Sequence, residues 1–395
     1  MRIVDVNEFY SPTGGGVRTY LERKMAILAA LGHELIVIAP GPADREERRS
    51  EGGRLITVKA PPLPFDRNYH LFWDAPPVWR WLDRLAPDVV ETSSPWKPAW
   101  FVADWPGEAA RVFFMHNDNM AAYPQRWFEG IASVAQVERA FGWYSRYMNR
   151  FLARFDAVVT NGPALFKRLA RRGVRVDASM PLGIERAHFS PALRDEGLRA
   201  DMLASCRLPA DARLLLGLGR HHPEKRWPMV IDAVERAARE RPVGLILLGD
   251  GVDRQAIQRR IAGSPHIRAC RPVYERERFA RILASADALI HGSEVEPFGL
   301  VASEAMAAGL PLIVPDEGGC AEVADPRCAE LYAARDAASA AAAIDRLFGR
   351  DPLALRRAAL KAARRVRTDR EHAVDLIAYY QSVLDQRRAP WASAA

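Results

Sequence analysis

Short apolar runs recur along the whole chain, and segments with helical periodicity separate them. In the first half the predicted strands are Arg2–Val6, Leu35–Ala39, Leu55–Val58, Asp88–Glu91, Val112–Met115 and Ala157–Thr160. In the second half they are Leu214–Leu218, Gly244–Leu248, His266–Ala269, Ala288–Ile290 and Leu312–Val314. Strands that alternate with helices in this way build parallel sheets covered by helices on both faces. The pattern therefore predicts an α/β protein with doubly wound parallel sheets.

Chain length indicates how many such sheets to expect. With 395 residues, the chain can form about two domains, each with its own apolar core. Polar, proline-bearing sequence from about Pro181 to Arg213 lies between the two sets of strands and is the expected interdomain linker. We therefore expect one Rossmann-like domain over residues 1–185, a second over residues 186–365, and a C-terminal helix with a tail over residues 366–395.

Charge and cysteine content limit the kind of partner and compartment. Lys and Arg number 56 against 49 Asp and Glu, which leaves room for an anionic partner such as phosphates or a lipid surface. The basic residues are spread over many predicted helices without an aromatic RNA-binding motif, so nucleic acid is not an expected partner. The four cysteines lack metal-ligand spacing. With a strand at the N-terminus and no apolar run of about 18 residues, we expect a cytoplasmic protein that is not integral to a membrane.

Residues 291–311 carry the most functional information. This segment follows a predicted buried strand, turns at Glu296-Pro297-Phe298-Gly299 and continues as a helix. Pro297 stiffens the turn, Gly299 allows the backbone to approach a ligand closely, and the helix start offers unpaired N–H groups to an anion. The carboxylates of Glu296 and Glu304 can accept hydrogen bonds from hydroxyl groups. A polyol that carries phosphate, such as a nucleotide sugar, fits this combination.

This segment closely resembles the Glu-x7-Glu signature of family 4 retaining glycosyltransferases, which have the GT-B fold. That fold has two Rossmann-like domains that face a central cleft, the first for the acceptor and the second for the nucleotide-sugar donor, and a C-terminal helix that crosses back onto the first. The resemblance implies that Glu304 holds the ribose hydroxyls and that Glu296 lies against the donor sugar. The other expected donor-binding residues of the second domain are Val273, Phe298, Gly299, Leu300 and Val301.

A basic loop follows the predicted strand Leu214–Leu218. Its sequence, Arg220 to Arg226, resembles the family's Gly-Arg-x-x-x-Glu-Lys element, although Arg226 stands where glycine is more usual. Arg220 as a planar fork and Lys225 as a point charge can both reach one diphosphate. Open α/β sheets bind ligands at the carboxyl ends of their strands. We therefore expect Arg220 and Lys225 to be donor-binding and catalytic residues, with a surface role in solubility as the alternative.

Two features of the first domain complete the expected site. The first turn between a strand and a helix contains Gly14, Gly15 and Gly16, which allow close approach to a phosphate, although no G-x-G-x-x-G fingerprint is present. The resemblance implies that Gly15 and Gly16 face the donor diphosphate; a merely flexible loop is the alternative. His116 follows the strand Val112–Met115. In the family such a histidine contacts the sugar or its departing oxygen, whereas a structural histidine is the alternative.

The family chemistry is a retaining hexosyl transfer. The acceptor hydroxyl attacks from the face that the nucleotide leaves, and the leaving phosphate oxygen takes its proton. No Asp-x-Asp motif is present, so we expect no metal and no cofactor, with Arg220, Lys225 and helix N-termini stabilising the diphosphate. The sequence of the Glu296 loop resembles that of mannosyl- and glucosyltransferases that act on lipids and polysaccharides, which suggests GDP-mannose or a UDP-hexose as donor. A GT-B sugar-nucleotide epimerase and a non-catalytic nucleotide-binding protein remain open.

The acceptor domain contains most of the tryptophans, since eight of the ten lie between Trp73 and Trp143. One helix is expected there, with an apolar face of Val134, Val137, Phe141, Tyr144, Met148 and Phe151. A second face carries Arg139, Trp143, Arg146, Arg150 and Arg154. A basic stripe with an aromatic residue is typical of docking on an anionic leaflet, which would make the protein peripheral at the inner membrane face. A solvated helix face is the alternative, and the same aromatics also suit stacking on a saccharide acceptor.

Overall fold

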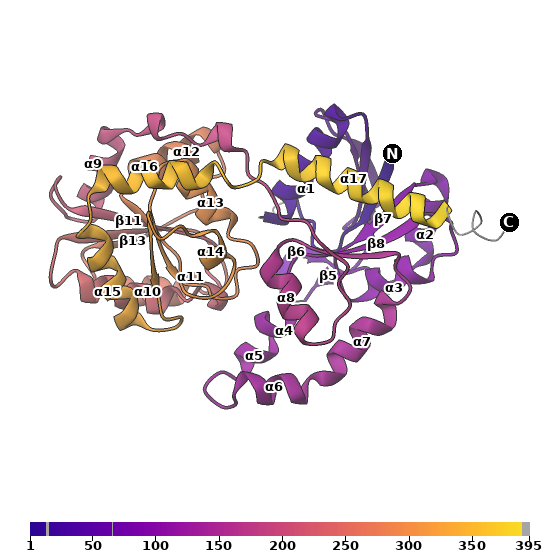
Figure 1. Ribbon diagram of the computed structural model, residues 1–395, viewed down its shortest axis with the longest axis horizontal. Helices are drawn as coiled ribbons and strands as arrows, with labels where there is room; N and C mark the ends of the chain where they lie inside the picture. The colour runs from indigo at the N-terminus through magenta and orange to yellow at the C-terminus, as the bar shows by residue number, and fades with distance from the viewer. Residues whose placement is uncertain (13–15, 65, 389–395) are drawn as a thin grey trace. The chain divides into compact units, whose positions relative to one another are not determined.

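The computed structural model describes residues 1–12, 16–64 and 66–388, and the chain forms two compact units (Figure 1). Unit 1 comprises residues 1–181 and 369–395, and unit 2 comprises residues 182–368. The final helix therefore packs with the N-terminal part of the chain, as the GT-B resemblance implied. The boundaries expected from the sequence were residues 185 and 365.

Unit 1 contains an eight-stranded sheet in the order β10-β9-β8-β7-β1-β2-β4-β3. Its strands are β1 (Arg2–Val6), β2 (Glu34–Gly41), β3 (Arg45–Arg48), β4 (Arg54–Lys59), β7 (Val89–Thr92), β8 (Ala110–Met115), β9 (Ala157–Thr160) and β10 (Ala178–Ser179), with a small hairpin of β5 (Pro62–Leu63) and β6 (Asp66–His70). All neighbouring strands of the sheet are parallel except β3, which runs antiparallel to β4. The helices are α1 (Gly16–Ala30), α2 (Pro76–Leu85), α3 (Lys97–Asp104), α4 (Asn119–Ala122), α5 (Pro124–Trp127), α6 (Val134–Ala140), α7 (Gly142–Leu152), α8 (Pro163–Arg171) and α17 (Asp369–Arg388).

Unit 2 contains a six-stranded parallel sheet in the order β13-β12-β11-β14-β15-β16. Its strands are β11 (Arg213–Leu218), β12 (Val243–Leu248), β13 (Ile267–Cys270), β14 (Ala288–Ile290), β15 (Leu312–Pro315) and β16 (Ala329–Tyr332). Its α-helices are α9 (Glu196–Ser205), α10 (Trp227–Ala237), α11 (Arg254–Ile261), α12 (Arg276–Ser285), α13 (Leu300–Ala307), α14 (Gly319–Val323), α15 (Ala337–Phe348) and α16 (Pro352–Ala363). Short 3-10 turns are η1 (Arg186–His188), η2 (Pro191–Leu193) and η3 (Pro223–Lys225).

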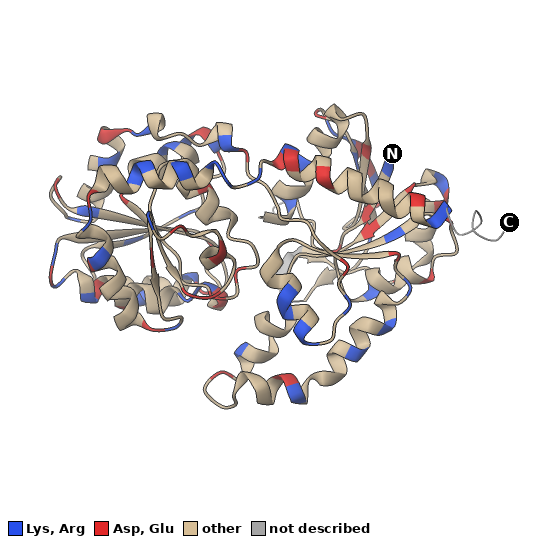
Figure 2. Ribbon diagram, in the orientation of Figure 1, with Lys and Arg blue, Asp and Glu red and all other residues tan. Residues whose placement is uncertain are grey.

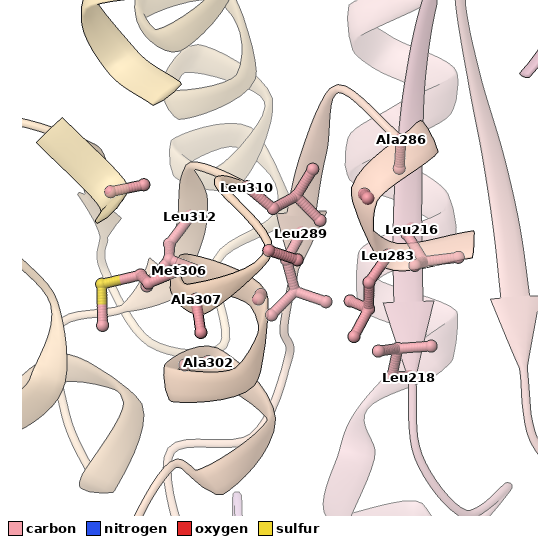
Figure 3. Close-up of a cluster of buried hydrophobic side chains, with 14 of the residues drawn as sticks. Leu216, Leu218, Leu283, Ala286, Leu289, Ala302, Met306, Ala307, Leu310 and Leu312 are labelled. Atoms are coloured by element: carbon pink, nitrogen blue, oxygen red, sulfur yellow. The ribbon is translucent and has the colours of Figure 1, made fainter. Parts of the chain in front are cut away.

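Successive strand residues bury their side chains on opposite faces of the unit 2 sheet. Leu214, Leu216 and Leu218 of β11 belong to the core under α12, α13 and α16, whereas Leu215 belongs to the core under α10 and α15. In Figure 3, Leu216 and Leu289 of the sheet face the helix side chains of the first of these cores. Strands covered on both faces need apolar residues at nearly every position, which is why these runs were recognisable in the sequence.

Two expectations about the chain path are wrong. Residues 182–213 are not a free linker, because α9 lies within them and buries Leu203 in the core of unit 2. The expected single helix after residue 133 is two helices, α6 and α7, which meet at Phe141 with φ −96° and ψ 16°. Gly142 follows this break, and glycine is a poor residue for the interior of a helix. No helix within the described residues is long and apolar enough to span a bilayer.

Candidate functional site

The strand order of unit 2 locates a ligand-binding edge. Numbered along the chain, its strands lie in the order 3-2-1-4-5-6, and the order reverses between β11 and β14. Ligands of open α/β sheets bind beyond the carboxyl ends of the strands at such a reversal. The loops that leave β11 and β14 contain Arg220, Lys225 and Glu296, so the predicted donor-site residues of these loops share this edge.

An ion pair joins the two loops. Lys225 Nζ lies 2.5 Å from Glu296 Oε2, and the side chains are 13% and 19% exposed. Burial is the largest single influence and disfavours the charge on each. The attraction between the two, to which Glu224 adds at Lys225, outweighs burial, so the pKa of Lys225 is raised and the pKa of Glu296 is lowered. Both groups are therefore charged at neutral pH. A cation and a carboxylate lie side by side at the edge where a phosphate and a sugar would be bound.

His291 lies beneath this ion pair and was not singled out from the sequence. Its Nε2 is 3.7 Å from Glu296 Oε2, and its Nδ1 accepts a hydrogen bond of 3.2 Å from the Ser293 N–H. Burial, with help from the Lys225 charge, lowers the pKa of His291 to about 4. The ring is neutral at pH 7, and since Nδ1 accepts, Nε2 carries the hydrogen. The sequence signal was a histidine at the end of a buried strand.

Glycines keep the Glu296 loop close to its neighbours. The Gly319 N–H donates to the Glu296 carbonyl at 2.6 Å, and a Cβ at Gly319 would lie 2.4 Å from the Phe298 nitrogen. Gly299 adopts φ 77° immediately before α13, and a Cβ there would lie 2.7 Å from the Gly319 carbonyl oxygen. Side chains at these positions would separate the two loops, which explains the glycine expected at 299.

Arg220 is the exposed member of the basic loop. Its side chain is 63% exposed and donates to Glu224 Oε1 at 2.9 Å. Lys225 and Arg220 thus differ, because Lys225 is already paired with the partly buried Glu296 carboxylate, while the guanidinium of Arg220 faces solvent. An exposed guanidinium retains donors for a phosphate.

The remaining predicted donor residues occupy the same loops or their continuation. Glu304 lies in the second turn of α13 and is partly buried. Phe298 is buried, with an exposed fraction of 9%, whereas Leu300, Val301 and Val273 are partly buried against the core of unit 2. The structure brings Lys225 and Glu296 into contact; the roles of the others in donor binding stay predictions.

In unit 1, only some of the predicted residues can be placed. Gly15 lies outside the described residues, and Gly16 begins α1. His116 follows β8 and stacks on Phe114, with ring centroids 4.4 Å apart. Burial, with the nearby Lys24 charge, lowers the pKa of His116 to about 3, so the imidazole is neutral at physiological pH. A neutral ring can exchange hydrogen bonds but cannot act as a cationic acid.

A buried charged cluster in unit 1 was not predicted. Lys24 Nζ of α1 lies 2.8 and 2.7 Å from the two carboxylate oxygens of Glu91 in β7, and Tyr380 of α17 donates to Glu91 Oε2 at 2.5 Å. Glu91 is opposite Asp5 in the β1–β7 register. Burial, reinforced by Glu91, raises the pKa of Asp5 to about 8. The cluster attaches α1 and the final helix to the sheet.

The predicted basic stripe lies along α6 and α7. Figure 2 shows basic residues on this arm of unit 1. All five residues of the stripe are exposed, namely Arg139, Trp143, Arg146, Arg150 and Arg154. The end of α5 and the loop that follows it add exposed apolar side chains, with Trp127 of α5 65% exposed and Ile131 of the loop 81% exposed. The helix break at Phe141 therefore leaves an arm with basic and apolar residues on its surface.

Two family models match the chain. Residues 14–179 match the model described as Glycosyltransferase Family 4, and residues 212–350 match the model described as Glycosyl transferases group 1. The first match lies in unit 1 and the second in unit 2.

Whole-chain relatives agree with these matches. A GDP-mannose-dependent alpha-mannosyltransferase of Mycolicibacterium smegmatis is 28% identical over 402 residues, which cover 98% of this chain and 99% of the relative. A GDP-mannose-dependent alpha-(1-6)-phosphatidylinositol dimannoside mannosyltransferase of Mycobacterium tuberculosis is 28% identical over 335 residues, covering 82% and 84%. The solved structure of sucrose-phosphate synthase from Thermosynechococcus elongatus superposes with a TM-score of 0.77 at 23% identity, covering 98% of this chain and 99% of that one.

Proposed function

Because the chain belongs to the family 4 glycosyltransferases of the GT-B fold, we propose that it transfers mannose from GDP-mannose to a lipid or saccharide acceptor. The observation that supports this best is the Lys225–Glu296 pair at the ligand-binding edge of unit 2. Lys225 and the exposed Arg220 offer positive charge to a diphosphate, and Glu296 offers a carboxylate to sugar hydroxyls. The choice of GDP-mannose follows the names of the relatives in Mycolicibacterium and Mycobacterium.

We propose that the reaction retains the anomeric configuration and needs no metal or other cofactor. As the bond to the leaving phosphate breaks, negative charge grows on the diphosphate, and Lys225 and Arg220 stabilise it. The departing oxygen takes the proton of the attacking hydroxyl. Glu296 stays ionised and is paired with Lys225, which suits a role in holding hydroxyls rather than in donating a proton.

The decisive experiment offers the protein GDP-mannose, UDP-glucose and UDP-galactose in parallel, with membrane lipid extract or soluble mannosides as acceptor. We expect acceptor-dependent release of GDP from GDP-mannose, an α-linked product by NMR, and nearly unchanged rates in EDTA. A β-linked product would contradict retention. Abolition by EDTA with rescue by Mn²⁺ would contradict metal independence. Sugar epimerisation without an acceptor would favour the epimerase, and nucleotide binding without turnover would favour a non-catalytic binding protein.

We propose that the α5–α7 arm binds an anionic membrane surface that carries the acceptor. Exposed arginines attract anionic headgroups, and exposed Trp127 and Ile131 suit the interfacial region. Flotation with vesicles should require anionic lipid and weaken as salt rises, since charges are screened over about 8–10 Å. Replacing Arg139, Arg146, Arg150 and Arg154 together by Gln should abolish flotation while activity on a soluble acceptor survives. Equal flotation of variant and wild type would leave the stripe as a solvated helix face.

A further inference from the structure

Glu294, two residues before Glu296, is a buried carboxylate held by two arginines from separate segments. Arg226 Nε donates to Glu294 Oε2 at 2.6 Å while its Nη2 donates to Oε1, and Arg335 Nε lies 3.2 Å from the same Oε1. The Glu294 side chain is 4% exposed. A buried carboxylate is tolerated when charged donors satisfy it, and a forked pair with arginine also fixes its direction.

Both arginines adopt a backbone conformation that L side chains disfavour. Arg226 has φ 49° and Arg335 has φ 69°, in the left-handed region. In this conformation Cβ comes too close to the following carbonyl oxygen, so residues other than glycine adopt it only at a cost. Arg226 also joins η3 to α10, a position where glycine would be less strained. An arginine at such a position indicates that its side chain is needed, and its guanidinium reaches Glu294.

Two ion pairs thus connect the same two loops in parallel. Consecutive residues on one loop, Lys225 and Arg226, meet alternate residues on the other, Glu296 and Glu294. The loops touch at Gly292, where a Cβ would lie 2.5 Å from the Lys225 carbonyl oxygen. The pairs differ in geometry, because Lys225 is a single ammonium group that a phosphate can attract, whereas Arg226 is a fork occupied by both oxygens of one carboxylate.

We propose that Arg226 and Arg335 form a clamp on Glu294 that keeps the two loops in register when a donor diphosphate draws Lys225 away from Glu296. This inference rests on the proposed function, because it assigns a task to the loops that bind the donor. Arg226, Arg335 and Glu294 are positioning residues: their donors and acceptors are used on one another. Without the clamp, binding of the diphosphate weakens the remaining bridge, and Glu296 is no longer held against the sugar.

The test compares Arg226→Gly, Glu294→Gln and the double variant with wild type, using GDP-mannose and the acceptor identified above. Arg226→Gly removes the forked half of the clamp, suits the left-handed backbone and leaves Arg335 paired with Glu294, so we expect the melting temperature to change by about 4 °C or less. Misplacement of Glu296 should lower kcat about 10- to 100-fold, while calorimetry gives a GDP dissociation constant within about threefold of wild type, a difference of less than 0.7 kcal/mol. The double variant should be no worse than the poorer single variant, since both remove one interaction.

Arg241→Gln is the matched control, because Arg241 Nε pairs with Asp345 at 2.9 Å on the surface of unit 2; its kcat should equal that of wild type. If Arg226→Gly melts far below wild type, Arg335→Gln takes its place, since that side chain is 42% exposed. Its kcat should then fall several-fold at an unchanged melting temperature. Unchanged kcat in the folded variants, or equal losses in kcat and GDP affinity, overturns the clamp. Wild-type protein that turns over no nucleotide sugar overturns the proposed function instead.

Discussion

Each unit contains a Lys–Glu pair next to the point where strand order reverses, and the two pairs differ in burial and surroundings. In unit 1, the Lys24 and Glu91 side chains are 2% and 0% exposed, and Glu91 is part of β7. In unit 2, the Lys225 and Glu296 side chains are 13% and 19% exposed, and both belong to loops beyond the strand ends. The same two residue types are enclosed between helices and sheet in one unit and partly exposed beyond the strand ends in the other.

Neighbouring groups reinforce this difference. Glu91 also accepts from Tyr380, and Lys24 lies 5.6 Å from the ring centroid of Tyr20, so the first pair is saturated. Beside the second pair, His291 Nε2 makes no hydrogen bond within the described part of the chain. The first pair attaches helices to a sheet, whereas the second has beside it a buried ring nitrogen without a hydrogen-bond partner among the described residues. The two pairs have the same composition and differ in their position relative to the strand ends, and the predictions below test whether that position sets their roles.

The largest expected effect comes from breaking the Lys24–Glu91 pair, which we call the enclosed pair. Lys24→Met leaves Glu91 as an uncompensated buried charge and should lower the free energy of unfolding of unit 1 by about 3–5 kcal/mol. Urea unfolding followed by tryptophan fluorescence suits the measurement, because eight of the ten tryptophans lie between residues 73 and 143. The double variant Lys24→Met/Glu91→Leu should regain much of this loss. A loss below 1 kcal/mol in the single variant would mean that the pair is not structural.

Breaking the Lys225–Glu296 pair, which we call the open pair, should affect turnover instead of folding. Lys225→Ala removes a charge that stabilises the leaving diphosphate, which we expect to cost about 2.7–4 kcal/mol in kcat, or a factor of 10²–10³. The unfolding midpoint should fall less than in Lys24→Met, because Glu296 at 19% exposure can regain contact with water. Arg220→Ala should lower kcat without any change in folding, since that side chain is 63% exposed. A Lys225→Ala variant that unfolds but keeps kcat would reverse the comparison.

Much of the fold was predictable because its buried strands are visible in the sequence as short apolar runs. A strand such as Leu214–Leu218 is covered on both faces, so its residues form an uninterrupted apolar run. The glycine expected at 299 agrees with the backbone, which has φ 77° there, whereas the donor-binding roles of Arg220 and Gly299 stay predictions. The break at Phe141 was missed because the apolar spacing continues through it, and only Gly142 marked a weak point for the helix.

The enclosed pair and the clamp were not predictable for a different reason. Lys24 and Glu91 are 67 residues apart in the sequence, and Arg226 and Glu294 are 68 residues apart. Each residue alone resembles a solvated surface charge, which is what most lysines and glutamates are. Only the packing of the elements shows that these charges are buried together.

A smaller effect is expected at Glu304, where a substitution should weaken nucleotide binding, in contrast to the loss of turnover expected at the open pair. Glu304 is predicted to accept from the ribose hydroxyls, and Glu304→Ala should cost about 1.5–3 kcal/mol of nucleotide affinity, which corresponds to a ten- to a hundredfold weaker dissociation constant. Calorimetry with GDP measures this directly, and an unchanged melting temperature shows that α13 is intact. Glu317→Ala, an exposed carboxylate in unit 2, is the control. An unchanged dissociation constant would remove Glu304 from the donor site.

The smallest expected effect concerns how the unfolding free energy depends on pH, which tests the charge state of Asp5 beside the enclosed pair. Burial, together with Glu91, raises the pKa of Asp5 from 3.8 to about 8, so Asp5 is protonated in the folded protein at pH values where it is ionised in the unfolded chain. Its contribution to stability is therefore fully present below about pH 4 and is lost as pH rises toward 8. Asp5→Asn keeps a neutral side chain at every pH, so its unfolding free energy should fall less steeply than that of wild type, by about 1.4 kcal/mol for each pH unit between pH 5 and 7. Asp44→Asn, at an exposed residue of the same unit, should leave the decline unchanged. Parallel pH dependences of the wild-type and Asp5→Asn unfolding free energies over this range would mean that Asp5 is ionised beside Lys24, and the enclosed cluster would then resemble the open pair in charge.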